Sequence, residues 1–235
     1  KTLFPYTTLS DLQVRVNVAF GGICGSDLHY YQHGGFGTVR IKQPMALGHE
    51  ISGVISALGT NVKHLTVGQR IAISPSRPCG SCRFCQAGQQ NHCLNMRFFG
   101  SAMPFPHIQG AFAEQLIIEA YQAHPIGQHL SLSEAALAEP LSVGLHAIQR
   151  AGGVLGKQVF VTGCGPIGSL LIGAFDALVL RGTIAQALCT TRRGVAWISR
   201  GIDNLCHTSF DQCLCTGAGA TGVVAGLEGN NECGP

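Results

Sequence analysis

The chain has 235 residues, of which 46% are hydrophobic and only 11% are charged, and its net charge is +3 at pH 7. This hydrophobic content is enough to build a core, which excludes a disordered chain. No dense stripe of Lys and Arg is present, which argues against nucleic acid as a partner. The longest uncharged segment is interrupted by glycine and proline, so we expect no membrane-spanning helix.

The N-terminal region carries no basic segment followed by an apolar one, so no secretory signal is visible and we expect a cytoplasmic protein. The chain opens at Lys1 rather than at a methionine, and we interpret this as a truncated start. The sequence contains 11 cysteines, an odd number. Without a secretion signal a disulfide framework is a poor interpretation of them, and metal binding is a better one.

The first 125 residues are predicted to be rich in β-strands. Val14, Val16 and Val18 alternate with polar residues, as in a half-buried strand. Further apolar runs, bounded by glycine or proline, occupy residues 51–58, 67–74 and 111–119. Glycine-rich loops such as residues 34–37 separate them.

From about residue 130 the pattern predicts helices. Ser131 and Glu134 have the spacing of a capping box, and a helix is expected over residues 142–150, ending at Gly152. A short buried strand at residues 158–162 follows, and an apolar helix begins after it. We place a domain boundary near residue 145, which gives domains of residues 1–145 and 146–235.

The strongest metal-binding signal is the spacing Cys79-x2-Cys82-x2-Cys85-x7-Cys93. Four thiolates close in sequence form a tetrahedral site for a d¹⁰ cation, and Gly80 permits the tight turn that this requires. A site closed by four cysteines has no open position, so we interpret it as a structural zinc site. An iron–sulfur cluster or four free thiols are the alternatives.

A second candidate metal site combines Cys24 with His49. Asp27 follows the cysteine and Glu50 follows the histidine, and both supply carboxylates beside or within the set of ligands. Two such residues on two loops are compatible with a metal site. For either residue alone, a buried thiol or a core histidine is the simpler interpretation.

A glycine fingerprint follows the strand at residues 158–162 and opens a helix, which is the context that gives it meaning. Gly163 makes the turn, Gly165 lets a pyrophosphate approach the backbone, and Gly168 allows close packing of helix on strand. A proline fits the first helical turn, where its missing N–H costs little. The predicted cofactor-binding residues are Gly163, Gly165, Pro166, Ile167 and Gly168.

Together these motifs resemble the zinc-dependent medium-chain alcohol dehydrogenase family over about residues 10–174. The segment Gly48-His49-Glu50-x2-Gly53-x5-Gly59-x2-Val62 matches the family's zinc signature, and the four cysteines match its structural-zinc lobe. Residues 21–31 and 96–103 look like the polyol branch. The resemblance implies an α/β fold with a β-rich part, in which a GroES-like catalytic domain precedes an incomplete Rossmann-type domain.

The resemblance also implies a ligand set for a catalytic zinc. Cys24 and His49 would bind the ion, with Glu50 as the third ligand and Glu139 linked through a zinc-bound water, or with these two glutamates exchanged. Asp27 would orient His49 through its second ring nitrogen. The implied cofactors are two zinc ions per chain and NAD or NADP.

The reaction implied by the resemblance is hydride transfer to NAD(P) from a secondary alcohol of a polyol or sugar acid. An L-idonate-like acid, oxidised at its 5-position, is the expected substrate class. Ser26 and His29 would form the proton relay away from the alcohol. A threonine- or formaldehyde-type dehydrogenase of the same family is an alternative. The resemblance allows a homo-oligomer for full-length members of the family, but the sequence does not fix the oligomeric state.

The resemblance ends at about residue 175. A complete fingerprint is followed about 20 residues later by an acidic residue that binds the ribose, yet residues 183–200 contain no Asp or Glu. Arg192 and Arg193 would suit NADP, but no strand pattern precedes them. A non-catalytic zinc-binding fragment, truncated or frameshifted, is therefore the second hypothesis. For the chain as given we expect zinc binding, weak or no NAD binding and little dehydrogenase activity.

Several aromatic and histidine side chains receive simpler interpretations. Phe98, Phe99 and Phe105 are predicted to lie in the core or in a cleft wall. The histidines expected in loops or on the surface are His33, His64, His107, His124 and His129.

Overall fold

The computed structural model describes residues 9–152, 154, 159–163, 165–178, 185–191, 194–200 and 222–224. The chain divides into two compact units, Lys1–Glu139 and Pro140–Pro235, and each is described by itself. The boundary expected near residue 145 lies inside helix α4 (Ala138–Arg150), which runs through this division.

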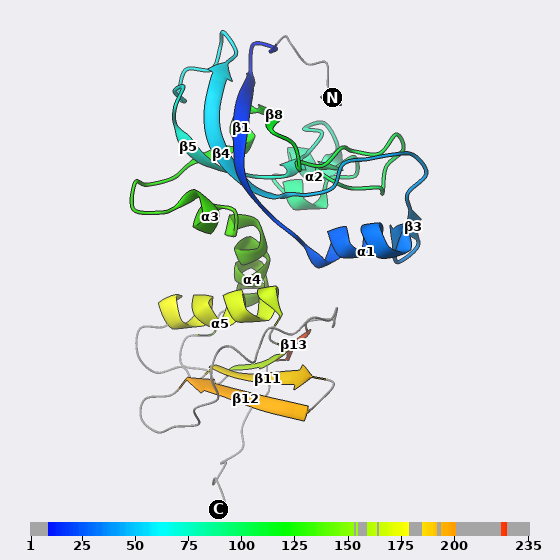
Figure 1. Cartoon of the computed structure of the whole chain (residues 1–235), viewed down its shortest axis with the longest axis vertical. Helices are drawn as coiled ribbons and strands as arrows, with labels where there is room; N and C mark the ends of the chain where they lie inside the picture. The colour runs from blue at the N-terminus through cyan, green and yellow to red at the C-terminus, as the bar shows by residue number, and fades with distance from the viewer. Residues whose placement is uncertain are drawn as a thin grey trace, which may run out of the picture. The chain divides into compact units, whose positions relative to one another are not determined.

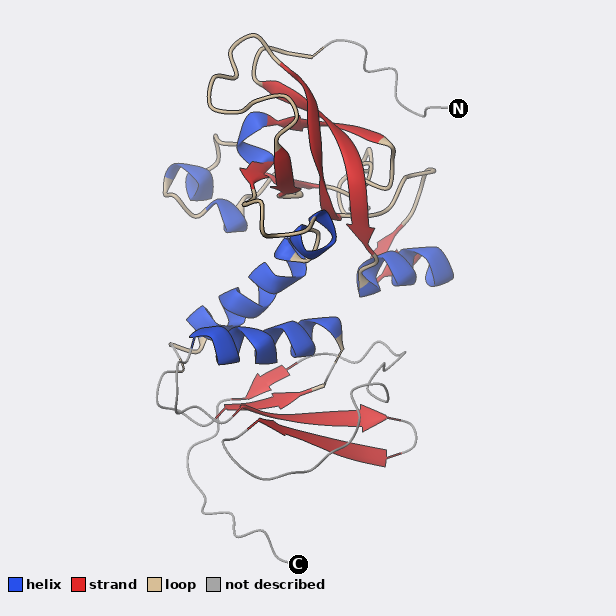
Figure 2. Cartoon of the chain, turned by 60° about the vertical axis from the view of Figure 1, so that its left-hand side comes forward, coloured by secondary structure: helices blue, strands red, loops and turns tan. Residues whose placement is uncertain are grey.

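The first unit is built on a five-stranded antiparallel sheet (Figures 1 and 2). The strand order is β8-β1-β4-β5-β9, and all of the strands expected from the sequence are present. The strand bounds are β1 (Gln13–Gly22), β4 (Glu50–Leu58), β5 (Arg70–Ile73), β8 (Gln115–Glu119) and β9 (Ala123–Pro125).

One face of this sheet carries the core. Val14 and Val16 are fully buried, and Ile51, Ile55 and Ile118 from the neighbouring strands pack with them. Because side chains alternate across a strand, the intervening residues of β1 lie on the other face. That alternation, read from the sequence as a half-buried strand, is confirmed.

Short elements connect the strands. Helix α1 (Gly25–His33) directly follows β1 and was not expected, whereas the capping box at Ser131 and Glu134 is confirmed at the start of α3 (Leu132–Ala135). The glycine-rich loop at residues 34–37 begins a small hairpin. The remaining elements are β2 (Gly35–Phe36), β3 (Val39–Arg40), β6 (Ser76–Arg77), α2 (Arg83–Gln86), η1 (Gln90–His92), β7 (Arg97–Phe98) and η2 (Ala120–Gln122).

After the end of α4, the second unit contains a strand–helix–strand crossover. Strand β10 (Val159–Thr162) leads through α5 (Pro166–Leu178) into β11 (Ala185–Thr191), and the two strands pair in parallel. Strand β12 (Gly194–Arg200) pairs antiparallel with β11, and β13 (Gly222–Val224) pairs antiparallel with β10. The described part is therefore one Rossmann-type crossover with antiparallel additions.

The expectation that no strand precedes Arg192 is wrong, because β11 ends at Thr191. Arg192 and Arg193 themselves lie outside the described residues. Within the described part of the chain, every helix is too short or too polar to cross a membrane.

Candidate metal centres

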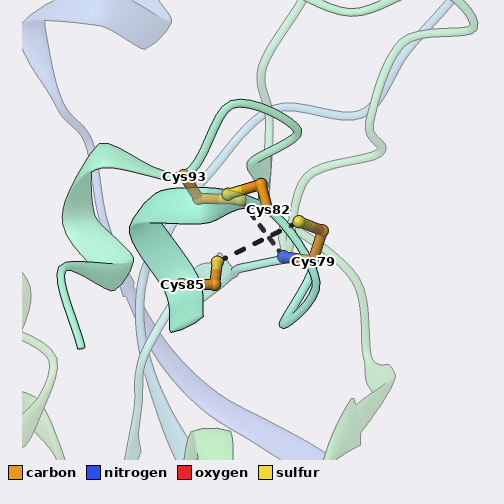
Figure 3. Close-up of side chains that lie close together, drawn as sticks. All are labelled: Cys79, Cys82, Cys85 and Cys93. Carbon is orange, nitrogen blue, oxygen red and sulfur yellow. Dashed lines mark hydrogen bonds between the residues drawn. The ribbon is translucent and has the colours of Figure 1, made fainter. Parts of the chain in front are cut away.

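The four cysteines of the first candidate site converge on one point (Figure 3). Their sulfur atoms all lie within 4.8 Å of one another, and the Cys79 and Cys85 sulfurs are 4.0 Å apart. The local backbone positions these sulfur atoms. Cys82 is the N-cap of α2, and Gly80 adopts a positive φ of 74° between Cys79 and Ser81. A residue with a Cβ would be strained in that conformation.

Backbone N–H groups surround two of these sulfurs. The N–H groups of Ser81 and Cys82 lower the pKa of Cys79 to about 5, and the N–H of Cys85 lowers the pKa of Cys82. Burial raises the pKa of Cys85 to about 12. The thiolate is the form that binds a metal. The loop stabilises the thiolates of Cys79 and Cys82 but not that of Cys85, so a bound cation is needed to keep all four sulfurs deprotonated.

The second site forms where β1 and β4 end side by side. Gly22 is paired with Glu50 across these two strands, Cys24 lies two residues beyond β1 as the cap of α1, and His49 directly precedes β4. Ligand atoms of Cys24, His49 and Glu50 all lie within 4.8 Å of one another. His49 and Glu50 are buried. The antiparallel register thus brings together residues that are distant in sequence.

Asp27 ties the two segments of this site together. Its carboxylate accepts a hydrogen bond from the Cys24 N–H (3.0 Å) and one from the Gly48 N–H (2.9 Å). The same carboxylate lies 3.7 Å from Nδ1 of His49, a buried ring nitrogen that has no hydrogen-bond partner within the described residues. Asp27 is only 2% exposed, so it acts as an internal clamp between the two segments.

The electrostatics of the second site match those of a site for a cation. Burial raises the pKa values of Cys24, Glu50 and Glu139, while the charge of His49 lowers those of the two glutamates. Crowded, partly desolvated anionic groups disfavour their own ionisation unless a positive charge is present. Glu139 lies within this field, but the group of converging ligand atoms does not include it.

The two predicted relay residues both lie on α1. The Ser26 hydroxyl forms a hydrogen bond with Cys24, which opposes the effect of burial on the thiol pKa. The His29 ring contacts Phe36 at a centroid distance of 5.1 Å and lies 5.8 Å from the ring of His33. Residues three apart on a helix share a face, so Ser26 and His29 are neighbours on α1.

Two aromatic residues near the second site have a role that the sequence pattern did not specify. The Phe98 ring lies 5.3 Å from the His49 ring, and Phe112 covers Gly48 so closely that a Cβ there would collide with its ring. Gly48 also has a positive φ of 95°. Phe99, by contrast, packs against the core.

His107 is a correction to the expectation of loop or surface histidines. It is only 6% exposed. Its Nε2 accepts a hydrogen bond from the Lys42 N–H (2.8 Å), and its Nδ1 lies 2.9 Å from the Pro104 carbonyl oxygen. The ring therefore connects two loops as a neutral imidazole that donates through Nδ1.

The Glu50 position yields a direct prediction. A Cβ on Gly22 would collide with the Glu50 carboxylate, so we expect Gly22→Ala to displace Glu50 and to lower the zinc content of the chain. Elemental analysis of the purified chain measures this. Gly25→Ala is the matched control, because a Cβ there meets no atom within 4 Å. Equal zinc contents in the two variants would contradict the placement of Glu50 at the metal.

The glycine fingerprint has the conformation expected of a nucleotide-binding turn. Gly163 has a positive φ of 89°, a Cβ on Gly168 would collide with the Gly163 carbonyl oxygen, and Gly165 faces open space. Pro166 is the first residue of α5, and the Ser169 N–H bonds to the Gly165 carbonyl oxygen at 2.9 Å.

Comparison with known proteins agrees with this geometry. Residues 10–128, half of the chain, match the family described as alcohol dehydrogenase GroES-like domain. The chain is 47% identical over 163 residues to L-idonate 5-dehydrogenase (NAD(P)(+)) of Escherichia coli (strain K12). This alignment covers 69% of this chain and 47% of that protein. The chain is 42% identical over 157 residues to D-xylulose reductase A of Aspergillus niger, which covers 67% of this chain and 43% of that protein.

Solved structures give the same result. The crystal structure of the L-idonate 5-dehydrogenase from Escherichia coli str. K-12 substr. MG1655 superposes with a TM-score of 0.70 and 43% identity, covering 74% of this chain and 50% of that one. A putative zinc-binding dehydrogenase from Sinorhizobium meliloti 1021 bound to NADP superposes with a TM-score of 0.66 and 33% identity, covering 76% and 49%.

The chain spans about half the length of these relatives. The matched region contains both candidate metal centres, and the fold and its metal-binding motifs agree with the matched domain. The chain therefore belongs to the zinc-dependent medium-chain alcohol dehydrogenase family.

Proposed function

We propose that this chain carries the catalytic domain of an NAD(P)-dependent dehydrogenase that oxidises a secondary alcohol of a polyol or sugar acid. The leading substrate is an L-idonate-like acid, which would be oxidised at its 5-position. The observation that carries the proposal is the convergence of Cys24, His49 and Glu50 at the ends of β1 and β4. A three-residue set of this kind leaves a fourth position open, which distinguishes a catalytic site from a closed structural one.

The residues present fit zinc. One thiol, one imidazole and one carboxylate are ligand types that zinc accepts, and the Nδ1 edge of the His49 ring faces Asp27, which leaves Nε2 for the metal. Zinc held there would supply Lewis acidity, lowering the pKa of a hydroxyl that reaches the open position. Asp27 would hold His49 and Cys24 in place through its contacts with both segments.

We propose Glu50 as the third ligand, because its carboxylate belongs to the converging group. Glu139 lies near enough to be influenced by the charge of His49, which supports a role through an intervening water. Four cysteines would hold a second, structural zinc, since their closed arrangement leaves no position for substrate.

The chain's own groups would remove the alcohol proton. Ser26 lies beside Cys24 and shares a face of α1 with His29, so the proton would pass from the hydroxyl to Ser26 and then to His29. The nicotinamide cofactor would be held at its pyrophosphate by the turn at Gly163 and the N-terminus of α5, where open space at Gly165 permits close approach. NAD and NADP share the pyrophosphate group, so the turn at Gly163 would not distinguish between them.

The substrate class rests on the relatives and on the ligand set. The similar proteins are named for L-idonate and D-xylulose, both polyhydroxylated carbon chains. A set with a single thiolate is harder than one with two, and hard ligands suit a metal that also meets several hydroxyl oxygens.

Cobalt substitution tests the proposal without depending on turnover. Co²⁺ in the site of Cys24, His49 and Glu50 gives visible absorption that changes when a ligand enters the open position. We expect L-idonate, sorbitol or xylitol to change this spectrum and threonine to leave it unchanged. The four-cysteine site also absorbs when it holds Co²⁺, so the signal to follow is the substrate-dependent difference spectrum, which should be absent in Cys24→Ala. A response to threonine alone would overturn the substrate class.

A cofactor titration separates an enzyme from a zinc-binding fragment. NADH fluorescence enhancement by the zinc-loaded chain, followed by an oxidation assay with NAD and with NADP, identifies a working dehydrogenase. Zinc binding without NADH enhancement would support the alternative of a non-catalytic fragment.

The proton relay makes its own prediction. His29→Ala is expected to slow alcohol oxidation about 10²–10⁴-fold near neutral pH, which is the usual contribution of general-base catalysis. The pH profile of kcat with the best substrate of the panel measures this. His33→Ala is the matched control on the same helix, and an unchanged profile in His29→Ala would remove His29 from the mechanism.

A further inference from the structure

The first unit contains a cavity formed by strands of its sheet and by the loops around them. Its volume is about 1040 Å³, and none of the candidate metal ligands lines it. Residues of β1 and β8, the paired strands β6 and β7 and the loop of residues 107–114 form its walls. Val14 and Val16 of β1 face the core, so Arg15 and Asn17 reach this cavity from the opposite face of the sheet.

The charge of this cavity is one-sided. Three arginines, Arg15, Arg77 and Arg97, line it, and Glu114 is the only acidic residue among the lining side chains. These are three of the chain's 15 lysines and arginines. Such a concentration on one concave surface produces a positive potential that attracts anions.

Within the described residues, one of the three arginines has a carboxylate partner. Arg77 lies 3.6 Å from Glu119, but within the described residues no carboxylate pairs with Arg15 or Arg97. The Nε of Arg15 is buried and has no hydrogen-bond partner in that part of the chain. A buried donor without an acceptor destabilises the folded state. A ligand that supplied an acceptor for the Arg15 Nε would remove this cost.

Guanidinium groups select the chemistry of the ligand. Their planar donors match the oxygens of a phosphate group in paired hydrogen bonds. The side-chain amides of Gln13, Gln109 and Gln115 also line the cavity, and amides suit hydroxyl groups. We propose that this cavity is a binding site for a small phosphate-bearing molecule, whose phosphate contacts Arg15, Arg77 and Arg97.

The cavity is connected to the second metal centre through the backbone. Phe112, which lines the cavity, donates its N–H to the Leu47 carbonyl oxygen at 2.9 Å, and the Ala111 N–H donates to that of Gly48 at 2.9 Å. The Gln109 side chain accepts from the Ala46 N–H at 2.8 Å. A ligand in the cavity would therefore restrain the segment that leads into His49.

The test uses inorganic phosphate and the zinc-loaded full chain. Thermal unfolding is followed at increasing phosphate, with chloride added to keep the ionic strength constant. We expect a saturable rise in Tm, because a ligand that binds only the folded state stabilises it. Arg97→Gln is expected to weaken the fitted affinity about tenfold or more, as the loss of a charge-assisted contact does, and Arg15→Gln to do the same.

Arg40→Gln is the matched control. It removes the same charge from an arginine that lies in the β2–β3 hairpin and does not line the cavity, so it should keep the phosphate response. Arg97 is exposed, so its variant remains interpretable even if Arg15→Gln fails to fold. The proposal would be overturned if Tm did not respond to phosphate up to about 10 mM, because a Kd above that concentration means very weak binding. Equal responses in Arg97→Gln and Arg40→Gln would also overturn it.

A second comparison fixes the ligand class. Glucose 6-phosphate should bind at least as well as inorganic phosphate, and glucose should not bind to the cavity. A stronger response to succinate than to phosphate, lost in Arg97→Gln, would show a carboxylate site and overturn the assignment to phosphate.

Discussion

Replacing Asp27 by alanine is expected to destabilise the first unit by about 3–5 kcal/mol, the range seen when one partner of a buried charged interaction is removed. The variant would leave the buried N–H of Gly48 and the partly buried N–H of Cys24 without their acceptor. It would also leave His49 without its neighbouring carboxylate. Zinc affinity at the second centre should fall about 10–100-fold, as it does when groups that orient metal ligands are lost.

Urea unfolding and competition with a zinc chelator measure these two effects. Asp11→Ala is the matched control, because Asp11 is exposed and bonds to Thr60 and Asn61 at the surface. Its cost should stay within about 1 kcal/mol, the usual limit for exposed polar contacts. If the two alanine variants were equally stable and bound zinc equally, Asp27 would not be the clamp described above.

On the proposed assignment of two zinc ions, the Cys93→Ser variant is expected to lose the ion of the four-cysteine site and to destabilise the loop of residues 79–93. The free energy of structural zinc binding reaches about 10–16 kcal/mol in small zinc domains and forms part of their folding free energy. Removing one of four thiolates should therefore cost more stability than any other single change considered for this chain. Metal analysis together with thermal unfolding tests it.

Cys24→Ser provides the complementary variant. It should release the other ion and leave the four-cysteine site loaded, with a smaller loss of stability. A wild-type chain that holds a single zinc, retained in Cys93→Ser, would contradict the assignment of two independent centres.

The four-cysteine site was accessible to sequence analysis because all of its ligands lie in one short segment, where spacing and glycine turns nearly determine the geometry. The second site was accessible only through the wider motif. Cys24 and His49 meet through the pairing of β1 with β4, and a register between distant strands cannot be read from either segment alone.

Other features depended on tertiary contacts. Helix α1 buries only Asp27 and Tyr30, so it has no apolar stripe that periodicity could reveal. His107 lies in an ordinary-looking loop, and its burial follows from two loops that close over it. Strand β11 has the sequence AQALCTT, which lacks a strong strand pattern, and its pairing with β10 comes from the crossover through α5.

The hydrogen bonds between residues 46–48 and residues 109–112 have a consequence for biosynthesis. The four-cysteine loop spans only residues 79–93, so closing it costs little conformational entropy. On a growing chain it is complete once residue 93 has emerged. The segment before His49 gains its supporting partners only after residue 112. Of the proposed metal ligands, Cys24 is the first to be synthesised, yet its candidate centre is the last of the two to acquire its final geometry.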